Sequence, residues 1–131
     1  MNAKTIIASI SLAALPAVGT DLEGGTFDGL TTTKEGTHCA VVLLPGTAEE
    51  LTWEAAKAWA AEQGGERPTR TVASLLFANV QPALSPEWHW TADEYGASSA
   101  WGCGFYGGSQ GSYHKGNELA AVAVRLIPIT A

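Results

Sequence analysis

The chain has 131 residues, which is enough for one domain with a short extension and for an apolar core that needs no metal ion or disulfide. Apolar residues make up 46% of the sequence, which excludes a disordered chain, and charged residues make up only 15%, which is typical of a surface that packs against other subunits. The formal net charge is −6 and the sequence has no basic stripe, so nucleic acid and anionic membranes are poor partners, and no nucleic-acid binding is expected.

Residues 1–36 are predicted to form an N-terminal arm for anchoring or oligomerisation. Lys4 precedes an apolar run over residues 6–15, which residues 16–19, Pro-Ala-Val-Gly, follow. This run is too short to span a bilayer, and an apolar segment that a monomer would leave exposed favours contact with another subunit. A secretory signal peptide is the alternative, because a basic residue before a short apolar stretch also fits such a signal. The Gly- and Thr-rich residues 24–36 predict hairpin turns or an extended arm.

A buried strand and a helix are predicted at the start of the domain that covers residues 37–131. Residues 38–44 form a near-continuous apolar run that favours a buried strand, and residues 47–51 are expected to be a connector. The clearest helix covers residues 52–63. Thr52 can cap its N-terminus, alanines favour it intrinsically, and a Gly-Gly pair can end it by supplying a positive φ.

A second helix is predicted from Thr69, a good N-cap, to about Asn79. Pro82 and Pro86 then bar any further helix. Each helix has an apolar face for the core, made of Trp53, Ala56 and Ala60 in the first helix and of Val72, Leu75 and Leu76 in the second.

From Trp88 onward the sequence alternates with period two, which favours strands. Residues 100–106 and 109–115 are predicted to form a β-hairpin around the Gly107-Gly108 turn, because paired glycines suit a tight turn. Residues 119–127 are predicted to form one final strand. Together these elements indicate an α+β fold in which two helices pack on small antiparallel sheets, with an extended N-terminal arm.

Neither catalysis nor a metal site is expected, and no cofactor is predicted. Cys39 and Cys103 lie far apart in apolar runs, which favours two buried free thiols over a disulfide. A Cys103–His114 pair could form if their strands pair, but the sequence supplies no third orienting group and no oxyanion hole. The spacing of the histidines and cysteines does not fit zinc, and no acidic cluster fits calcium.

A recognition surface is predicted among the glycines near the hairpin, because binding loops favour Tyr, Ser, Gly and Asn. The alternative is that the tyrosines only cap the edge of the core. Trp53, Trp88, Trp90, Trp101 and Phe105 are expected in the core, since Trp mainly supplies buried area. The predicted ligand-binding residues are Tyr95, Tyr106, Ser109, Gln110, Ser112, Tyr113, His114 and Asn117.

The order of several motifs over about residues 43–127 resembles a phage and bacterial domain family of C-type-lectin-like fold. This family is similar to the C-terminal domains of collagen-like bacterial adhesins. The resemblance implies a non-enzymatic oligomer found in virions or at cell surfaces. The calcium–sugar motifs of true lectins are missing, so it does not imply calcium-dependent sugar binding. The motifs that carry it are Trp53-Glu54-Ala55-Ala56-Lys57-Ala58-Trp59-Ala60, Gly64-Gly65-Glu66-Arg67-Pro68-Thr69-Arg70, Leu75-Leu76-Phe77-Ala78-Asn79, Trp88-His89-Trp90-Thr91, Trp101-Gly102-Cys103-Gly104-Phe105 and Ala123-Val124-Arg125.

Two functions follow as hypotheses from the resemblance, the small size and the apolar N-terminal run. The first is a phage virion protein, namely a head decoration protein, a head fibre or a tail-fibre component. Its partners would be other virion subunits, further copies of itself, with a trimer as one option, and a cell-surface glycan or protein. The second is a secreted or cell-surface adhesin-like binding protein, which requires the first twenty residues to be a signal peptide.

Overall fold

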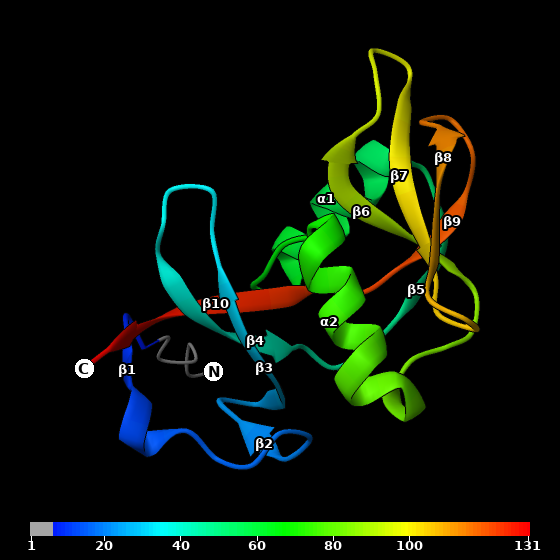
Figure 1. Cartoon of the computed structure of the whole chain (residues 1–131). Helices are drawn as coiled ribbons and strands as arrows, with labels where there is room; N and C mark the ends of the chain where they lie inside the picture. Colours follow the sequence, from blue (N-terminus) through cyan, green and yellow to red (C-terminus); the bar gives the residue numbers. More distant parts are fainter. Residues whose placement is uncertain (1–6) are drawn as a thin grey trace.

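The computed structural model describes residues 7–131, which form an α+β fold of two five-stranded sheets and two helices. Figure 1 shows the sheets side by side, with α2 running between them. The first sheet has the order β1-β10-β4-β3-β2, with bounds Ile10–Ser11, Val124–Thr130, His38–Leu43, Gly25–Thr32 and Asp21–Leu22. The second has the order β5-β9-β6-β7-β8, with bounds Ala48–Leu51, Leu119–Ala121, Trp88–Glu94, Ser99–Gly104 and Ser109–His114.

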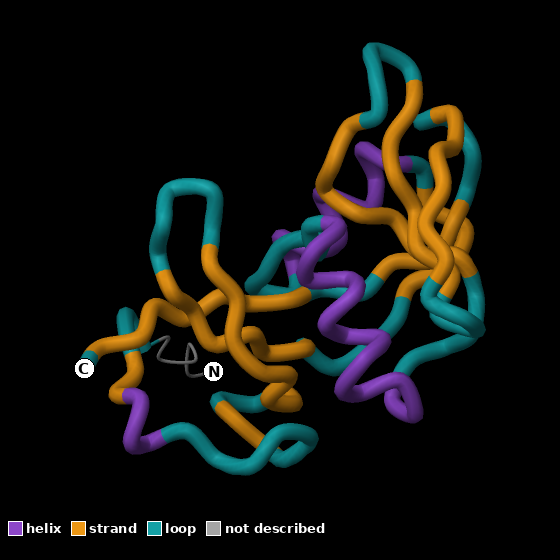
Figure 2. The backbone as a smooth tube through the Cα atoms, in the orientation of Figure 1, coloured by secondary structure: helices purple, strands orange, loops and turns teal. Residues whose placement is uncertain are grey.

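Both sheets are mixed rather than purely antiparallel, which corrects the prediction of small antiparallel sheets. The β1–β10 and β6–β9 pairs are parallel, and the remaining strand pairs are antiparallel. Figure 2 shows that the loops joining β3 to β4 and β6 to β7 project toward the same side of the molecule in this view.

Strand β4 lies at the centre of the first sheet and is covered on both faces. Val41 and Val42 are fully buried and point to opposite faces, as neighbours in a strand must. Val41 belongs to a cluster that includes Val72 and Leu76 of α2, whereas Val42 belongs to a cluster with Ala60 of α1. Burial on both faces explains the near-continuous apolar run at residues 38–44 and confirms the predicted strand.

The described part of the N-terminal arm packs on the first sheet. Ile10 pairs with Ile129 at the sheet edge, and Ile7, Ile10 and Leu15 pack on the cluster that contains Phe27. Strand β3 pairs with β4 along most of its length, so the expected boundary at residues 36/37 falls in the turn of this hairpin. Residues 1–6, which begin the predicted arm, lie outside the described residues.

Both predicted helices are confirmed, with their caps. Helix α1 spans Trp53–Glu62, and Thr52 Oγ1 accepts a hydrogen bond from Ala55 N at 3.3 Å. Gly64, with φ +85°, follows its end. Helix α2 spans Arg70–Val80, and Thr69 Oγ1 accepts from Val72 N at 3.2 Å. The 3-10 helices η1 and η2 cover Leu12–Ala14 and Gln81–Ala83.

The structure corrects two predictions about the connections between strands. The expected connector at residues 47–51 contains strand β5, which pairs with β9. The expected single strand at residues 119–127 is two strands, β9 and β10, which belong to different sheets. Residues 120–124 are all buried where the chain crosses from one sheet to the other, so alternation fails there.

The tryptophans divide into core and surface. Trp53 and Trp90 are buried, and their indole N–H groups donate to Thr91 O at 2.8 Å and Leu51 O at 2.7 Å. Phe105 is also buried, as predicted. Trp88 and Trp101 are only half-buried, so their expected place in the core is wrong. Cys39 and Cys103 are buried free thiols, which confirms that prediction.

Candidate ligand-binding face

One face of the β6–β7–β8 sheet has a floor of glycines with aromatic rings lying on it. Gly102 pairs with Gly111 across β7 and β8, and the next position on this face of β7 is Gly104, which pairs with Trp88. A Cβ atom placed at Gly104 would lie 2.5 Å from Tyr106 Cε1 and 3.0 Å from Trp88 Cε2. The glycines therefore allow the close approach of rings to backbone.

The aromatic face is defined here as Trp88, Tyr106 and Tyr113. The Trp88 ring centroid lies 6.0 Å from that of Tyr106 and 5.3 Å from that of Tyr113, and both pairs have edge-to-face geometry. Such pairs hold their rings in place by quadrupole attraction as well as by burial. Tyr106 is 58% exposed, and the other two residues are half-buried. Flat aromatic surface held rigidly and open to solvent suits ligand contact.

The opposite face of this sheet carries a second aromatic cluster that is closed by hydrogen bonds. The Arg70 guanidinium lies 3.6 Å from the Trp101 ring centroid, and its Nε donates to Gln110 Oε1 at 2.8 Å. Gln110 Nε2 donates in turn to Arg70 O and to Ser74 Oγ. Asp93 Oδ2 accepts from Arg70 N at 2.7 Å. We call this network the Arg70 clasp, because it fastens the N-terminus of α2 to the sheet.

The predicted site residues are thus brought together only in part. Tyr106, Ser109 and Tyr113 lie at the aromatic face, and Gln110 belongs to the Arg70 clasp. Tyr95 is 62% exposed and packs edge-on against Trp101, on the clasp side. Ser112, His114 and Asn117 are exposed on strand β8 and the turn after it. In that turn, Gly116 N donates to His114 Nδ1 and Asn117 N donates to His114 O.

Sequence reasoning missed Trp88 as a surface residue. Trp88 and Trp90 have the same spacing signal, and both project toward the same face of β6. Only Trp90 is covered, because it packs with Trp53 and Ala56 of α1. A helix that reaches one of two equivalent positions leaves no local trace in the sequence. Trp88 pairs with Gly104 in β7 and Trp90 pairs with Gly102, so the cross-strand glycines do not distinguish the two positions either.

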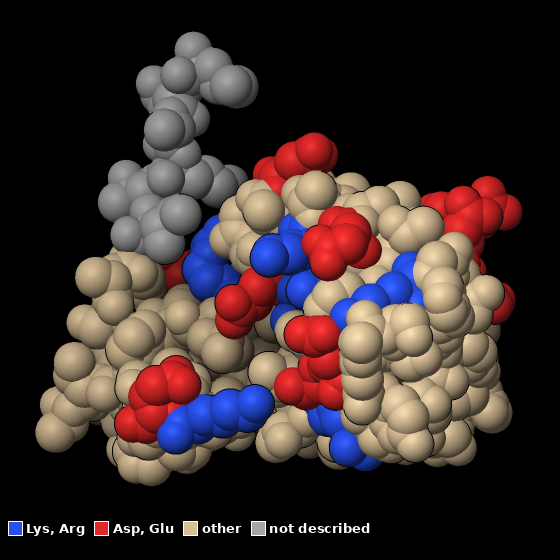
Figure 3. All heavy atoms as spheres, turned by 90° about the horizontal axis from the view of Figure 1, so that it is seen from above, with Lys and Arg blue, Asp and Glu red and all other residues tan. Residues whose placement is uncertain are grey.

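An acidic groove borders Trp88. Its cavity measures about 380 Å³ and is lined by Trp88, Leu119, Ala120, Glu49, Glu50, Glu87 and Glu118. Four carboxylates in one groove disfavour an anionic ligand beside the aromatic face. Acidic and basic side chains are interspersed on the upper surface that Figure 3 shows, with no continuous basic band on the part formed by the described residues.

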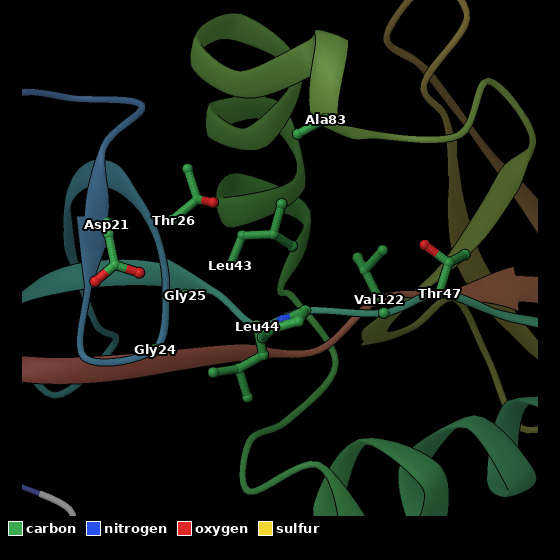
Figure 4. Close-up of a pocket in the computed structure, with 11 residues that line it drawn as sticks. Asp21, Gly24, Gly25, Thr26, Leu43, Leu44, Thr47, Ala83 and Val122 are labelled. Carbon is green, nitrogen blue, oxygen red and sulfur yellow. The ribbon is translucent and has the colours of Figure 1, made fainter.

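A further cavity lies between the β2–β3 turn and the end of β4. It measures about 280 Å³, and Figure 4 shows Asp21, Gly24, Gly25 and Thr26 facing Leu43 and Leu44 across it. Asp21 is the charged residue of its lining. A Cβ at Gly25 would lie 2.5 Å from Leu43 O, so this glycine is required by strand packing. The lining contains no nucleophile with a neighbouring base, and it supports no chemistry.

Cys103 and His114 do not pair, although the strands that carry them, β7 and β8, lie side by side. Cys103 pairs with His89 and Gln110, whereas His114 pairs with Ser99. Cys103 is fully buried, and burial raises the pKa of its thiol, so it stays protonated and unreactive. His89 is also fully buried; burial lowers the pKa of its imidazole, although Glu87 O, 2.7 Å from Nδ1, opposes this.

The described residues contain no group of three or more His, Cys, Asp or Glu side chains that could hold a metal ion. Neither α1 nor α2 has the length and apolarity that a membrane crossing requires, and these are the α-helices of the described residues.

No protein-family model matches the sequence, and no curated protein is significantly similar to it. The α+β class and the two sheets are properties of this structure, whereas the C-type-lectin-like assignment stays a prediction from the sequence motifs.

Proposed function

We propose that the chain is a non-enzymatic structural protein of a phage virion, namely a head decoration protein, a head fibre or a tail-fibre component. It displays a lectin-like domain for contact with the host surface or with another part of the particle. The aromatic face is the observation that carries this proposal. Exposed rings on a glycine floor suit recognition, and the Cys103 thiol is buried and does not pair with His114.

The ligand of the aromatic face is a neutral or cationic group on a cell-surface glycan or protein. Trp88, Tyr106 and Tyr113 supply flat apolar area, and the exposed Ser109 adds a hydroxyl. The neighbouring groove with Glu87 repels anions, which agrees with the net charge of −6.

Anchoring to the particle is assigned to the outward side of the N-terminal arm. Ile7, Ile10 and Leu15 pack inward, whereas Leu12 is 55% exposed and Val18 is 48% exposed. Exposed large apolar side chains in one segment suit a contact with another virion subunit. The Leu12→Ser/Val18→Ser double variant should therefore fold normally and fail to enter particles. Normal incorporation of this variant would contradict the anchoring role.

The proposal as a whole is tested by locating the chain in purified particles, with mass spectrometry of their proteins and immunogold labelling. We expect a particle protein with an intact arm. Recombinant chain labelled with a fluorophore should also bind host cells, and an excess of unlabelled chain should compete. Particles that lack the chain would contradict the proposal.

A secreted adhesin-like protein is the alternative, and the basic and apolar start of the sequence is the observation that favours it. The packing of Ile7, Ile10 and Leu15 into the core cluster supports retention of the arm instead, because its removal would uncover Phe27 and its neighbours. Mass spectrometry of the mature N-terminus decides between the two. Cleavage near Gly19, together with release into the medium, would support the alternative.

A further inference from the structure

Three of the four sheet edges in the described residues are unsuited to receiving another strand. The edge strands β1 and β2 contain two residues each. The edge strand β5 carries Glu49 and Glu50, its register against β9 shifts, and Glu50 has a φ of +56°. Short edges, charges and bulges are the devices by which proteins prevent edge-to-edge pairing.

Strand β8 is the exception. It spans Ser109–His114, and its sequence SQGSYH contains no charged residue and no proline. Its register against β7 runs without a shift through all six residue pairs. It ends the second sheet, so its outer side has no strand partner among the described residues. Figure 1 shows it at the margin of the molecule. An edge that is regular, uncharged and six residues long is open to pairing.

The direction of the free backbone groups follows from one hydrogen bond. Lys115 N donates to Ser98 O at 2.8 Å. Backbone groups alternate in direction along a strand, so Tyr113, Gly111 and Ser109 also point their N–H groups at β7. Gln110 and Ser112 therefore point their N–H and C=O groups outward. Thr91 Oγ1 donates to Trp101 O, which shows that Trp101, the partner of Ser112, likewise turns its carbonyl away from β8.

We propose that β8 pairs antiparallel with β8 of a second copy of this chain, about a twofold axis at Ser112. In this register Ser112 faces its own counterpart, and Gln110 faces His114 of the second copy. Tyr113 faces Gly111 of the second copy, which has no side chain of its own at that position. No like charges oppose each other along this pairing, even though each chain carries −6.

The self-complementary register is the reason to assign a second copy rather than an unrelated peptide. A twofold contact uses the same patch on both subunits, and β8 meets that condition at Ser112. Pairing also brings the two aromatic faces onto the same side of one continuous sheet, which would make ligand binding bivalent. The dimer stands independently of the virion assignment, and it differs from the trimer, which was one option for the predicted homo-oligomer.

The register is tested with single cysteines in the full chain. Ser112→Cys should form a disulfide-linked dimer under mild oxidation, because the twofold axis places this residue opposite itself. Ser109→Cys is the matched control, since it is exposed on the same strand. It would lie about 20 Å from its counterpart, beyond the reach of about 7 Å between Cα atoms that a disulfide allows. The native Cys39 and Cys103 are buried and do not compete. Equal cross-linking of both variants, or none in Ser112→Cys, would overturn the proposal.

The association itself is measured by sedimentation equilibrium. The protein concentration is raised to about 1 mM, so that a weak dimer with a Kd in that range is populated. Wild-type chain and Ser112→Thr should dimerise alike. Ser112→Lys should associate at least about tenfold more weakly, because two ammonium groups would meet at the axis, whereas a lysine on a free edge is tolerated in the monomer. An unchanged melting temperature shows that the Lys variant is folded. A monomeric wild-type chain, a trimer, or Lys and Thr variants that associate equally would each overturn the pairing.

Discussion

The two sheets of this protein differ in what covers them. Strand β4 in the first sheet is packed on both faces, and Val41 and Val42 are inaccessible to solvent. In the second sheet, Trp90 is covered by α1, whereas Trp88, Tyr106 and Tyr113 remain at the surface. The first sheet therefore holds the fold together, and the second sheet combines a buried half with an exposed half that can meet a ligand.

The glycines show the same difference at the level of single atoms. A Cβ at Gly25 would meet Leu43 O at 2.5 Å, and a Cβ at Gly104 would meet Tyr106 Cε1 at the same distance. The first obstacle is backbone inside a sheet, whereas the second is the outer part of a side chain that is 58% exposed. An added methyl group should thus lower the free energy of unfolding much more at Gly25 in the first sheet than at Gly104 in the second.

The largest effect is expected at Asp28, a buried carboxyl in β3 of the first sheet. It is fully buried, and neither of its side-chain oxygens has a hydrogen-bond partner among the described residues. Burial raises the pKa of Asp28 from 3.8 to about 7. The unfolded chain loses this proton at a lower pH than the folded chain does. The free energy of unfolding is therefore highest below pH 3.8 and falls as the pH rises to about 7. The loss should total about 4 kcal/mol.

Urea unfolding of wild-type protein and Asp28→Asn between pH 4 and pH 8 measures this loss. The amide cannot ionise, so the Asn variant should lack this component and gain stability over wild-type protein as pH rises. Parallel pH profiles of the two proteins would show that Asp28 does not carry the effect.

The next effect in size compares glycines of the two sheets. Gly25→Ala should lower the free energy of unfolding by about 3 kcal/mol, because the added methyl group meets backbone and Val42. Gly111→Ala should change it by about 0.5 kcal/mol or less, since its Cβ would lie 3.8 Å from Trp88. Chemical denaturation of both variants checks the contrast. Similar losses in the two would mean that the glycine floor of the aromatic face is as rigid as the core.

Features of the fold that depend on neighbouring residues were predicted well from the sequence. Features that depend on contacts between distant parts of the chain were not. Thr52 and Thr69 cap their helices as expected, because a cap depends on residues within one turn. The β7–β8 hairpin followed from its glycine turn. The division of residues 119–127 between two sheets did not, since neither Gly nor Pro marks the point where the chain crosses.

The candidate site was predicted by composition but not by arrangement. Tyr, Ser and Gly in the hairpin indicated a surface, yet strand alternation divides Tyr113 from Gln110 and places them on opposite faces. Trp88 completes the aromatic face because α1 packs against Trp90 and does not reach Trp88. Which face a helix covers is settled by packing across the chain, and a single sequence does not report it.

A smaller effect is expected from opening the Arg70 clasp. Arg70→Ala removes the stacking on Trp101 and the hydrogen bond to Gln110, and should cost about 1 kcal/mol because the residue is exposed. Arg70→Lys keeps the charge but loses the planar stack, so it should recover less than half of that loss. Thermal unfolding measures both. Ligand binding at the aromatic face should be unchanged, and a binding loss in Arg70→Ala would mean that the two faces are coupled.

The smallest effect on stability, and the sharpest on binding, is expected from two exposed tyrosines. Tyr95 is 62% exposed on the clasp side, and Tyr106 is 58% exposed at the aromatic face, so they are matched in chemistry and accessibility. Tyr95→Ser and Tyr106→Ser should each change stability by about 1 kcal/mol or less, because each loses only an edge-to-face contact, with Trp101 and Trp88 respectively. Tyr106→Ser should weaken attachment to host cells at least about tenfold, since truncating an aromatic anchor of a binding surface has an effect of that size. Tyr95→Ser should attach as wild-type protein does. The reverse result would move the binding surface to the clasp side, and equal losses would mean that both faces touch the ligand.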